Sequence, residues 1–113
     1  MRSNRGLVRW FLQRGTAIVL AAGVFVHFAV IHYGVERPIT AAKVAARLSS
    51  PGWVAFDCVL LLCALFHALN GVHGVILDFN PSERTRNISG WTFWVLGGIG
   101  ALVGVANLLP FSR

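Results

Sequence analysis

The residues best suited to chemistry in this sequence are histidines that stand inside long apolar segments. His67 lies in the middle of one such segment, in the run LFHALNGVHGVILDF. Ionisable side chains are costly in lipid, so those that occur there usually face a cofactor, a partner or the interior of a helical bundle. Imidazole is a good ligand for iron, and histidine is a common axial ligand of haem. His67 is therefore a candidate haem ligand, and the alternative is a histidine that bonds to a neighbouring helix.

Two further residues share the expected helix face of His67. Gly71 follows four residues later and would leave room for a flat macrocycle against the backbone. Asp78 follows eleven residues later, which at about 100° per residue returns to the same face, about 16 Å along the helix. A ligand in the middle of the apolar segment and an acid at its end suit a bound cofactor together with a site for a polar head group. The alternative for Asp78 is a residue at the membrane interface.

Membrane-spanning helices are the elements that must position these side chains. Apolar residues make up 56% of the 113 residues and charged residues only 12%, whereas soluble domains carry about 25% charged residues. Apolar segments cover about 12–33, 52–78 and 90–109, each close to the ~20 residues that cross a bilayer as a helix. We predict one all-α membrane domain, 1–113, with three transmembrane helices. A short amphipathic segment at about 40–48 should lie at the membrane surface.

The net charge of +6 does not indicate nucleic-acid binding, because the basic residues stand at the edges of the apolar segments, where membrane proteins keep them. They are more numerous in the N-terminal segment and the second loop than on the opposite side. This bias predicts a multi-pass protein with its N-terminus inside. No cleavage pattern follows the first apolar segment, which favours a bacterial or archaeal cytoplasmic membrane.

Three stretches of the sequence resemble the membrane anchors of succinate dehydrogenase. The second-helix motif of that family is a histidine, a glycine at plus four, and an aspartate at plus eleven followed by an aromatic residue. Here these are His67, Gly71, Asp78 and Phe79. Residues 14–17 resemble the R-x-[ST]-[AG] start of the first helix, and residues 50–57 resemble the S-P-x-W…D entry to the second. The resemblance covers residues 13–79 and is closer to the smaller of the two hydrophobic anchors in this family than to the larger one.

This resemblance implies a haem b-binding anchor subunit of a succinate:quinone oxidoreductase, which contributes no catalytic residue for succinate oxidation. Its partners would be a second hydrophobic anchor subunit, an iron–sulfur subunit and a flavoprotein subunit. Two three-helix anchors would hold the haem between them as halves of one helical bundle. His67 would be one axial ligand, and the partner anchor would supply the other. Quinone, the electron acceptor, would bind at the inner face near the iron–sulfur subunit.

Other residues acquire candidate roles from the same resemblance. His27 stands near the position of a first-helix histidine that ligates a second haem in two-haem anchors, with His32 as the substitute candidate. His73 replaces an arginine that is expected to meet a haem propionate. Arg14 is either a propionate or quinone-site contact or a positive-inside anchor. Phe79 replaces a tyrosine whose hydroxyl would bond quinone, so the resemblance assigns most of the quinone site to the partners.

Two other functions compete with this interpretation. A haem-free anchor of a fumarate reductase would share the helix count but would lack the ligand histidine. A small membrane transport or assembly protein would distribute polar residues over several helices. Here they concentrate on the first two, while the third segment has no ionisable residue. That segment is instead rich in small residues suited to close helix contact, namely Gly97, Gly98, Gly100 and Gly104.

Overall fold

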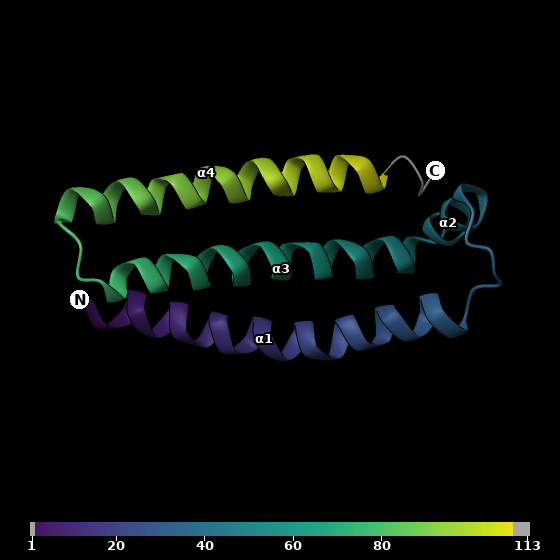
Figure 1. Cartoon of the computed structure of the whole chain (residues 1–113), viewed down its shortest axis with the longest axis horizontal. Coiled ribbons are helices and arrows are strands. Elements are labelled where there is room, and N and C mark those ends of the chain that lie inside the picture. The colour runs from purple at the N-terminus through teal and green to yellow at the C-terminus, as the bar shows by residue number, and fades with distance from the viewer. Residues whose placement is uncertain (1, 110–113) are drawn as a thin grey trace.

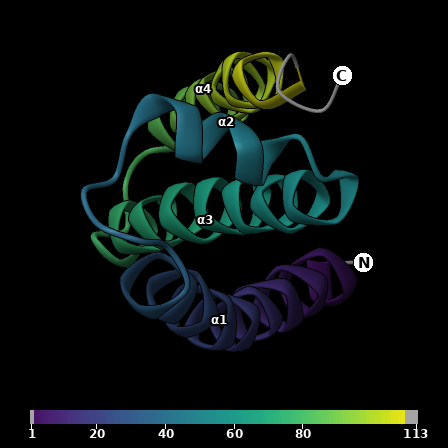
Figure 2. The ribbon, with the colours of Figure 1, turned by 90° about the vertical axis from the view of Figure 1, so that its right-hand side faces the viewer.

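The computed structural model describes residues 2–109, which form an elongated all-helical structure. Helices α1 (Arg2–Tyr33), α3 (Pro51–Asp78) and α4 (Glu83–Leu108) run alongside one another, with α3 between the other two (Figure 1). The short helix α2 (Ala41–Leu48) lies at the end of α3 that is remote from the N-terminus (Figure 1), and in a view from that end it crosses in front of the space between α3 and α4 (Figure 2). All three long helices contain stretches long and apolar enough to cross a membrane. The predicted all-α fold with three transmembrane helices is thus confirmed.

Two long helices begin earlier than their apolar segments. Helix α1 starts at Arg2 rather than near residue 12, and α4 starts at Glu83 rather than near residue 90. Hydropathy marks only where a segment becomes apolar, whereas helical hydrogen bonding continues through polar residues. The start of α4 is fixed by Ser82, whose hydroxyl accepts a hydrogen bond from the backbone N–H of Thr85 at 3.3 Å.

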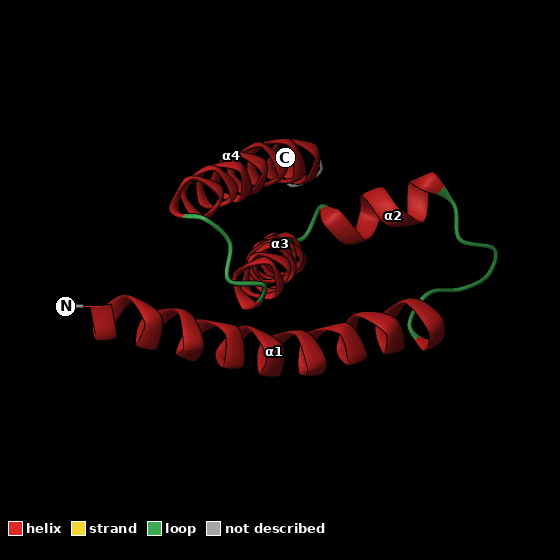
Figure 3. Cartoon of the chain, turned by 60° about the vertical axis from the view of Figure 1, so that its left-hand side comes forward, coloured by secondary structure: helices red, strands yellow, loops and turns green. Residues whose placement is uncertain are grey.

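The amphipathic segment expected near 40–48 forms α2, which packs against α3 (Figure 3). The hydroxyl of Thr40 caps this helix by accepting from the backbone N–H of Lys43 at 3.3 Å. Leu48 is buried at its end. Pro51 stands in the first turn of α3, where its missing N–H costs no helical hydrogen bond.

Glycines set how closely the long helices approach one another. A Cβ atom at Gly97 would lie 3.2 Å from Leu69, one at Gly100 would lie 3.1 Å from Leu65, and one at Gly104 would overlap Leu61. These glycines therefore form the α4 surface that packs on α3, as small residues do in membrane bundles. Gly98 has nothing within 4 Å of such an atom. On the other side of α3, Gly23 of α1 makes room for Leu60.

The outside of the chain is strongly apolar. Leu48 and Val54 are the buried hydrophobic residues of the described chain. Large side chains on all three long helices stay mostly exposed, for example Phe25 of α1 at 74%, Val75 of α3 at 57% and Trp94 of α4 at 72%. Contiguous apolar surface of this extent requires lipid or a partner protein to cover it.

Candidate functional site

His67 lies on the side of α3 that packs against α1. Its Nδ1 is 3.2 Å from the hydroxyl oxygen of Thr16. One turn earlier on α1, the amide of Gln13 donates to the backbone carbonyl of His67 at 3.2 Å and accepts from the amide of Asn70 at 2.8 Å. Two consecutive turns of α1 therefore hold both the backbone and the ring of His67.

The surroundings of His67 fit a haem ligand. Among the described residues its Nε2 has no hydrogen-bond partner, which leaves that nitrogen available to iron. Gly74, seven residues on and near the same helix face, has open space where a side chain would stand. Across residues 2–109 no group of three or more His, Cys, Asp or Glu side chains could hold a metal ion, but haem iron takes protein ligands one at a time.

Gly71 has a neighbour that the sequence did not indicate. A Cβ atom at Gly71 would lie 3.3 Å from the amide nitrogen of Gln13. Because Gly71 has no side chain, the side chain of Gln13 of α1 can lie against it. The open space beside α3 is found at Gly74 rather than at Gly71. A role for Gly71 beside a cofactor stays a prediction.

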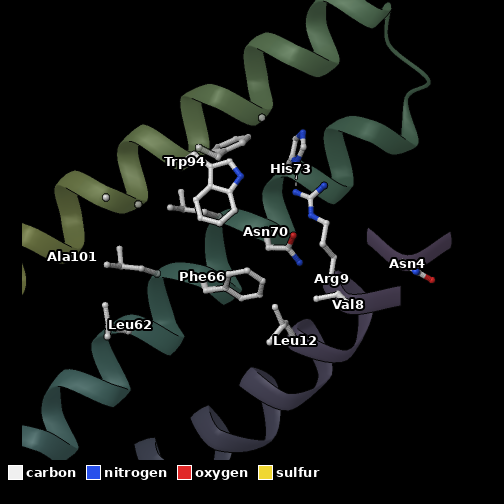
Figure 4. Close-up of a pocket in the computed structure, with 16 residues that line it drawn as sticks. Asn4, Val8, Arg9, Leu12, Leu62, Phe66, Asn70, His73, Trp94 and Ala101 are labelled. Atoms are coloured by element: carbon white, nitrogen blue, oxygen red, sulfur yellow. Dashed lines mark hydrogen bonds between the residues drawn. The ribbon is translucent and has the colours of Figure 1, made fainter. Parts of the chain in front are cut away.

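His73 lies on a different side of α3 and lines a cavity of about 940 Å³ between α1, α3 and α4. Figure 4 shows Arg9 reaching from α1 toward His73, and the guanidinium donates to Nδ1 of His73 at 2.8 Å. Within residues 2–109 the other ring nitrogen, Nε2, is buried and makes no hydrogen bond of ordinary length, although the backbone of Arg86 lies near the ring. Because Nδ1 accepts from Arg9, Nε2 carries the proton of the neutral ring and is a donor in need of an acceptor.

The rest of this cavity is mostly apolar. Asn4 and Asn70 add amides, and most of the remaining wall is formed by aliphatic and aromatic side chains from all three long helices, which include Leu12, Phe66, Leu69, Phe93 and Trp94 (Figure 4). Such a site suits an amphiphilic molecule whose polar group carries hydrogen-bond acceptors.

His27 belongs to a separate polar cluster near the opposite end of the helices. Its Nδ1 lies 3.7 Å from a carboxylate oxygen of Asp57 on α3. The same carboxylate receives two hydrogen bonds from the guanidinium of Arg47 on α2, each of 3.2 Å. The side chains of Asp57 and Arg47 are only 11% and 14% exposed. Nδ1 of His27 makes no hydrogen bond within residues 2–109, so the carboxylate of Asp57 is near this nitrogen but not bonded to it. Ligand histidines commonly bond a carboxylate through one ring nitrogen, and a small rotation of the ring would bring Nδ1 of His27 into that arrangement.

The other predicted site residues are exposed. Asp78 ends α3, and the ring of Phe79 just beyond it is 82% exposed. The guanidinium of Arg14 stacks over the ring of Trp10 at 5.1 Å, and within the described residues it makes no hydrogen bond to His67. The side chain of His32 shares a 3.2 Å hydrogen bond with Arg37 at the far end of α1.

Sequence reasoning missed Arg9, Gln13 and Thr16 as site residues. Their spacing of four and then three residues places them on one face of α1, and His27 falls on the same face eleven residues after Thr16. A polar stripe at helical spacing within an otherwise apolar helix was the signal that could have identified them.

The chain has relatives among known proteins. Residues 1–107 match the family described as succinate dehydrogenase/fumarate reductase transmembrane subunit. A succinate dehydrogenase hydrophobic membrane anchor subunit of Archaeoglobus fulgidus is 31% identical over 90% of this chain and 79% of its own length. Proteins of the same description from Thermoplasma acidophilum and Coxiella burnetii are 26% and 27% identical, over 96% and 74% of this chain and 89% and 71% of their own.

These matches agree with the three helices of spanning length. The chain is a multi-pass membrane protein that belongs to the family of succinate dehydrogenase/fumarate reductase transmembrane subunits.

Proposed function

We propose that this chain is the haem b-carrying membrane anchor subunit of a succinate:quinone oxidoreductase. The observation that carries the proposal is the environment of His67. This imidazole stands within a spanning helix and is held by Thr16 through one ring nitrogen, and within residues 2–109 its other nitrogen makes no hydrogen bond and is available to iron. The names of the relatives support the same assignment to a succinate dehydrogenase.

A bound haem would supply one-electron redox chemistry within the membrane. His67 would hold it from this chain, and a histidine of a second hydrophobic anchor subunit would complete the ligation. The chain itself fixes the imidazole, provides space beside Gly74 and excludes water with its apolar helices. Burial and ligand orientation are the means by which a protein adjusts the potential of such a group.

Purification of the complex in mild detergent followed by a reduced-minus-oxidised pyridine haemochrome spectrum tests this proposal. The wild-type complex should contain b-type haem, and His67→Leu should remove one haem per complex. Asn107→Leu is the matched control, because Asn107 is an exposed polar residue of a spanning helix whose side chain donates to the carbonyl of Val103 in its own helix. That variant should keep its full haem content.

A wild-type complex without haem would reject the haem proposal and leave the haem-free anchor of a fumarate reductase as the alternative. Co-purification of the other subunits tests separately whether this chain tethers them to the membrane. Flavoprotein and iron–sulfur subunits should elute with this chain, and their absence would instead favour a membrane transport or assembly protein.

We propose that this chain contributes to quinone binding at the end of the helices that carries the α3–α4 loop. Asp78 and Phe79 lie at that end of α3, and within residues 2–109 the buried Nε2 of His73 makes no hydrogen bond of ordinary length. A quinone carbonyl or a haem propionate oxygen would satisfy that donor. Since Phe79 cannot donate a hydrogen bond, the partners would supply the donor that a tyrosine provides in related anchors.

The N-terminus and the α3–α4 loop lie at the same end of the molecule (Figure 1), and we propose that this end faces the cytoplasm. The basic residues of both segments support that orientation. In a cysteine-free background made by replacing Cys58 and Cys63, a membrane-impermeant maleimide should label Ser49→Cys but not Ser82→Cys in intact cells. Reversed labelling would invert the topology.

A second haem bound through His27 is also proposed. Thr16 and His27 are eleven residues apart on one face of α1, which separates the two histidine sites by about 16 Å along the helix. The contact with Asp57 would orient the His27 ring.

A further inference from the structure

Thr16 makes three short contacts through one hydroxyl group. Its oxygen lies 2.7 Å from the backbone carbonyl oxygen of Leu12 and 3.2 Å from that of Gln13. It also lies 3.2 Å from Nδ1 of His67. Carbonyl oxygens only accept hydrogen bonds, and a hydroxyl group has a single proton to donate.

Counting protons decides the direction of the bond to His67. The hydroxyl proton of Thr16 is directed to the carbonyls of its own helix, of which Leu12 is the nearer. The hydroxyl oxygen can then only accept from His67. Nδ1 of His67 must therefore carry a proton, and in the neutral ring the lone pair stands on Nε2.

The same stretch of α1 restrains the ring as well as its protonation. Gln13 bonds the backbone carbonyl of His67 and the side chain of Asn70, which fixes the rotation of α1 against α3 at this level. Turning the imidazole over would break the bond to Thr16 in a segment where lipid offers no replacement. One orientation and one tautomer of His67 are thus selected together.

We infer that Thr16 is a positioning residue for His67, accepting the Nδ1 proton so that Nε2 is presented to a haem iron as the ligand nitrogen. This inference rests on the proposed function. A hydrogen bond from the remote ring nitrogen orients a ligand imidazole and raises its basicity, and loss of such a partner typically weakens metal binding about 10–100-fold.

The test compares Thr16→Val and Thr16→Ala, which lack the acceptor, with Thr16→Ser, which keeps it, in the purified complex. Thr92→Val is the matched control, because the Thr92 hydroxyl makes the same 2.7 Å bond within its own helix, to Ile88, and within residues 2–109 it makes no hydrogen bond to a histidine. The readouts are the low-temperature EPR spectrum of the ferric haem, its midpoint potential, and the rate of haem loss.

Both variants without an acceptor should shift the low-spin EPR signal, raise the midpoint potential and lose haem about tenfold faster. A more weakly donating imidazole favours the ferrous state, which sets the direction of the potential shift. Thr16→Ser and Thr92→Val should match wild type. Alanine removes atoms and cannot clash, so it covers the case in which valine disturbs assembly.

Identical EPR spectra and potentials for Thr16→Ala and Thr16→Ser, in a complex that loses haem when His67 is replaced, would overturn the inference alone. A wild-type complex with no haem, or full haem retention in His67→Leu, would overturn the proposed function instead.

Discussion

Arg47 of the short helix α2 binds Asp57 of α3 through two guanidinium–carboxylate hydrogen bonds, each of 3.2 Å. Its guanidinium also lies over the ring of Trp53, 4.8 Å from the ring centre. This Arg47–Asp57 pair connects the short helix α2 to the first part of a helix of spanning length. Planar, bidentate pairs are the strong form of this interaction, and both side chains are largely shielded from solvent.

Asp57→Asn should therefore release α2 from α3. Breaking a fully buried pair costs about 3–5 kcal/mol, and we expect about 2 kcal/mol at this helix end because water reaches the freed charge. Tryptic cleavage after Lys43 should accelerate about thirtyfold, since cleavage follows the opened fraction. The substitution leaves every tryptic site intact. Asp78→Asn is the control, because Asp78 is exposed and has no ion pair within residues 2–109; equal cleavage rates in both variants would contradict the prediction.

The three long helices and their approximate spans could be predicted from length and hydropathy, because lipid allows an apolar segment of this size hardly any other form. His67 could be singled out for the same reason, as an imidazole that lipid makes costly. The amphipathic helix α2 was visible from its alternation of small apolar and basic residues.

The pairing of α1 with α3 could not be predicted. It depends on how each helix is rotated, and a helix with apolar residues on every side carries little periodicity to reveal its packed face. The contact of Thr16 with His67 joins residues 51 positions apart. Gly71 illustrates the consequence: its spacing from His67 indicated room for a macrocycle, whereas the structure brings Gln13 against it.

The packing of α4 on α3 should depend on Gly104. Valine there would overlap Leu61, whereas valine at Gly98 would enter open space. Overpacking of this kind typically costs about 1–3 kcal/mol. In SDS titrations of the purified chain followed by tryptophan fluorescence, Gly104→Val should unfold at lower SDS than wild type. Gly98→Val makes the same chemical change on another face of α4, and its free energy of unfolding should stay within about 0.5 kcal/mol of the wild-type value. A larger loss of unfolding free energy in Gly98→Val than in Gly104→Val would contradict this packing.

The exposed ring of Phe79 offers a test of the proposed quinone contribution. Phe79→Tyr adds a hydroxyl group at the end of α3 that can donate to a quinone carbonyl. If the quinone head group binds at this end, the KM for a soluble quinone analogue should fall severalfold, as expected for one added hydrogen bond of about 1 kcal/mol. Phe79→Leu lacks the donor and should not lower KM. A KM for Phe79→Tyr equal to that of Phe79→Leu would place the head group away from this residue.

His27 allows the haem count to be tested at a single residue. With Nδ1 close to the carboxylate of Asp57, Nε2 is the nitrogen available to a second iron. His27→Leu should remove one of two b-type haems while the haem at His67 remains, as seen by pyridine haemochrome quantitation and redox titration. Asp57→Asn should keep both haems but alter the potential of the one at His27, because it removes the oriented carboxylate. His32→Leu tests the substitute candidate on the same helix: loss of the second haem in this variant, and not in His27→Leu, would assign the ligand to His32.

The alternative role for His27 makes a different prediction for the same variants. If His27 only pairs α1 with the Arg47–Asp57 pair of α2 and α3, the wild-type complex should contain one haem and His27→Leu should leave it unchanged. The free energy of unfolding would then fall in His27→Leu, because a partly buried polar contact between helices is lost. Both roles predict some loss of stability in His27→Leu, because the contact with Asp57 is lost in either case. The haem content of this variant therefore separates the two roles: one haem fewer than wild type supports the ligand role, and unchanged haem content together with lower stability supports the structural role.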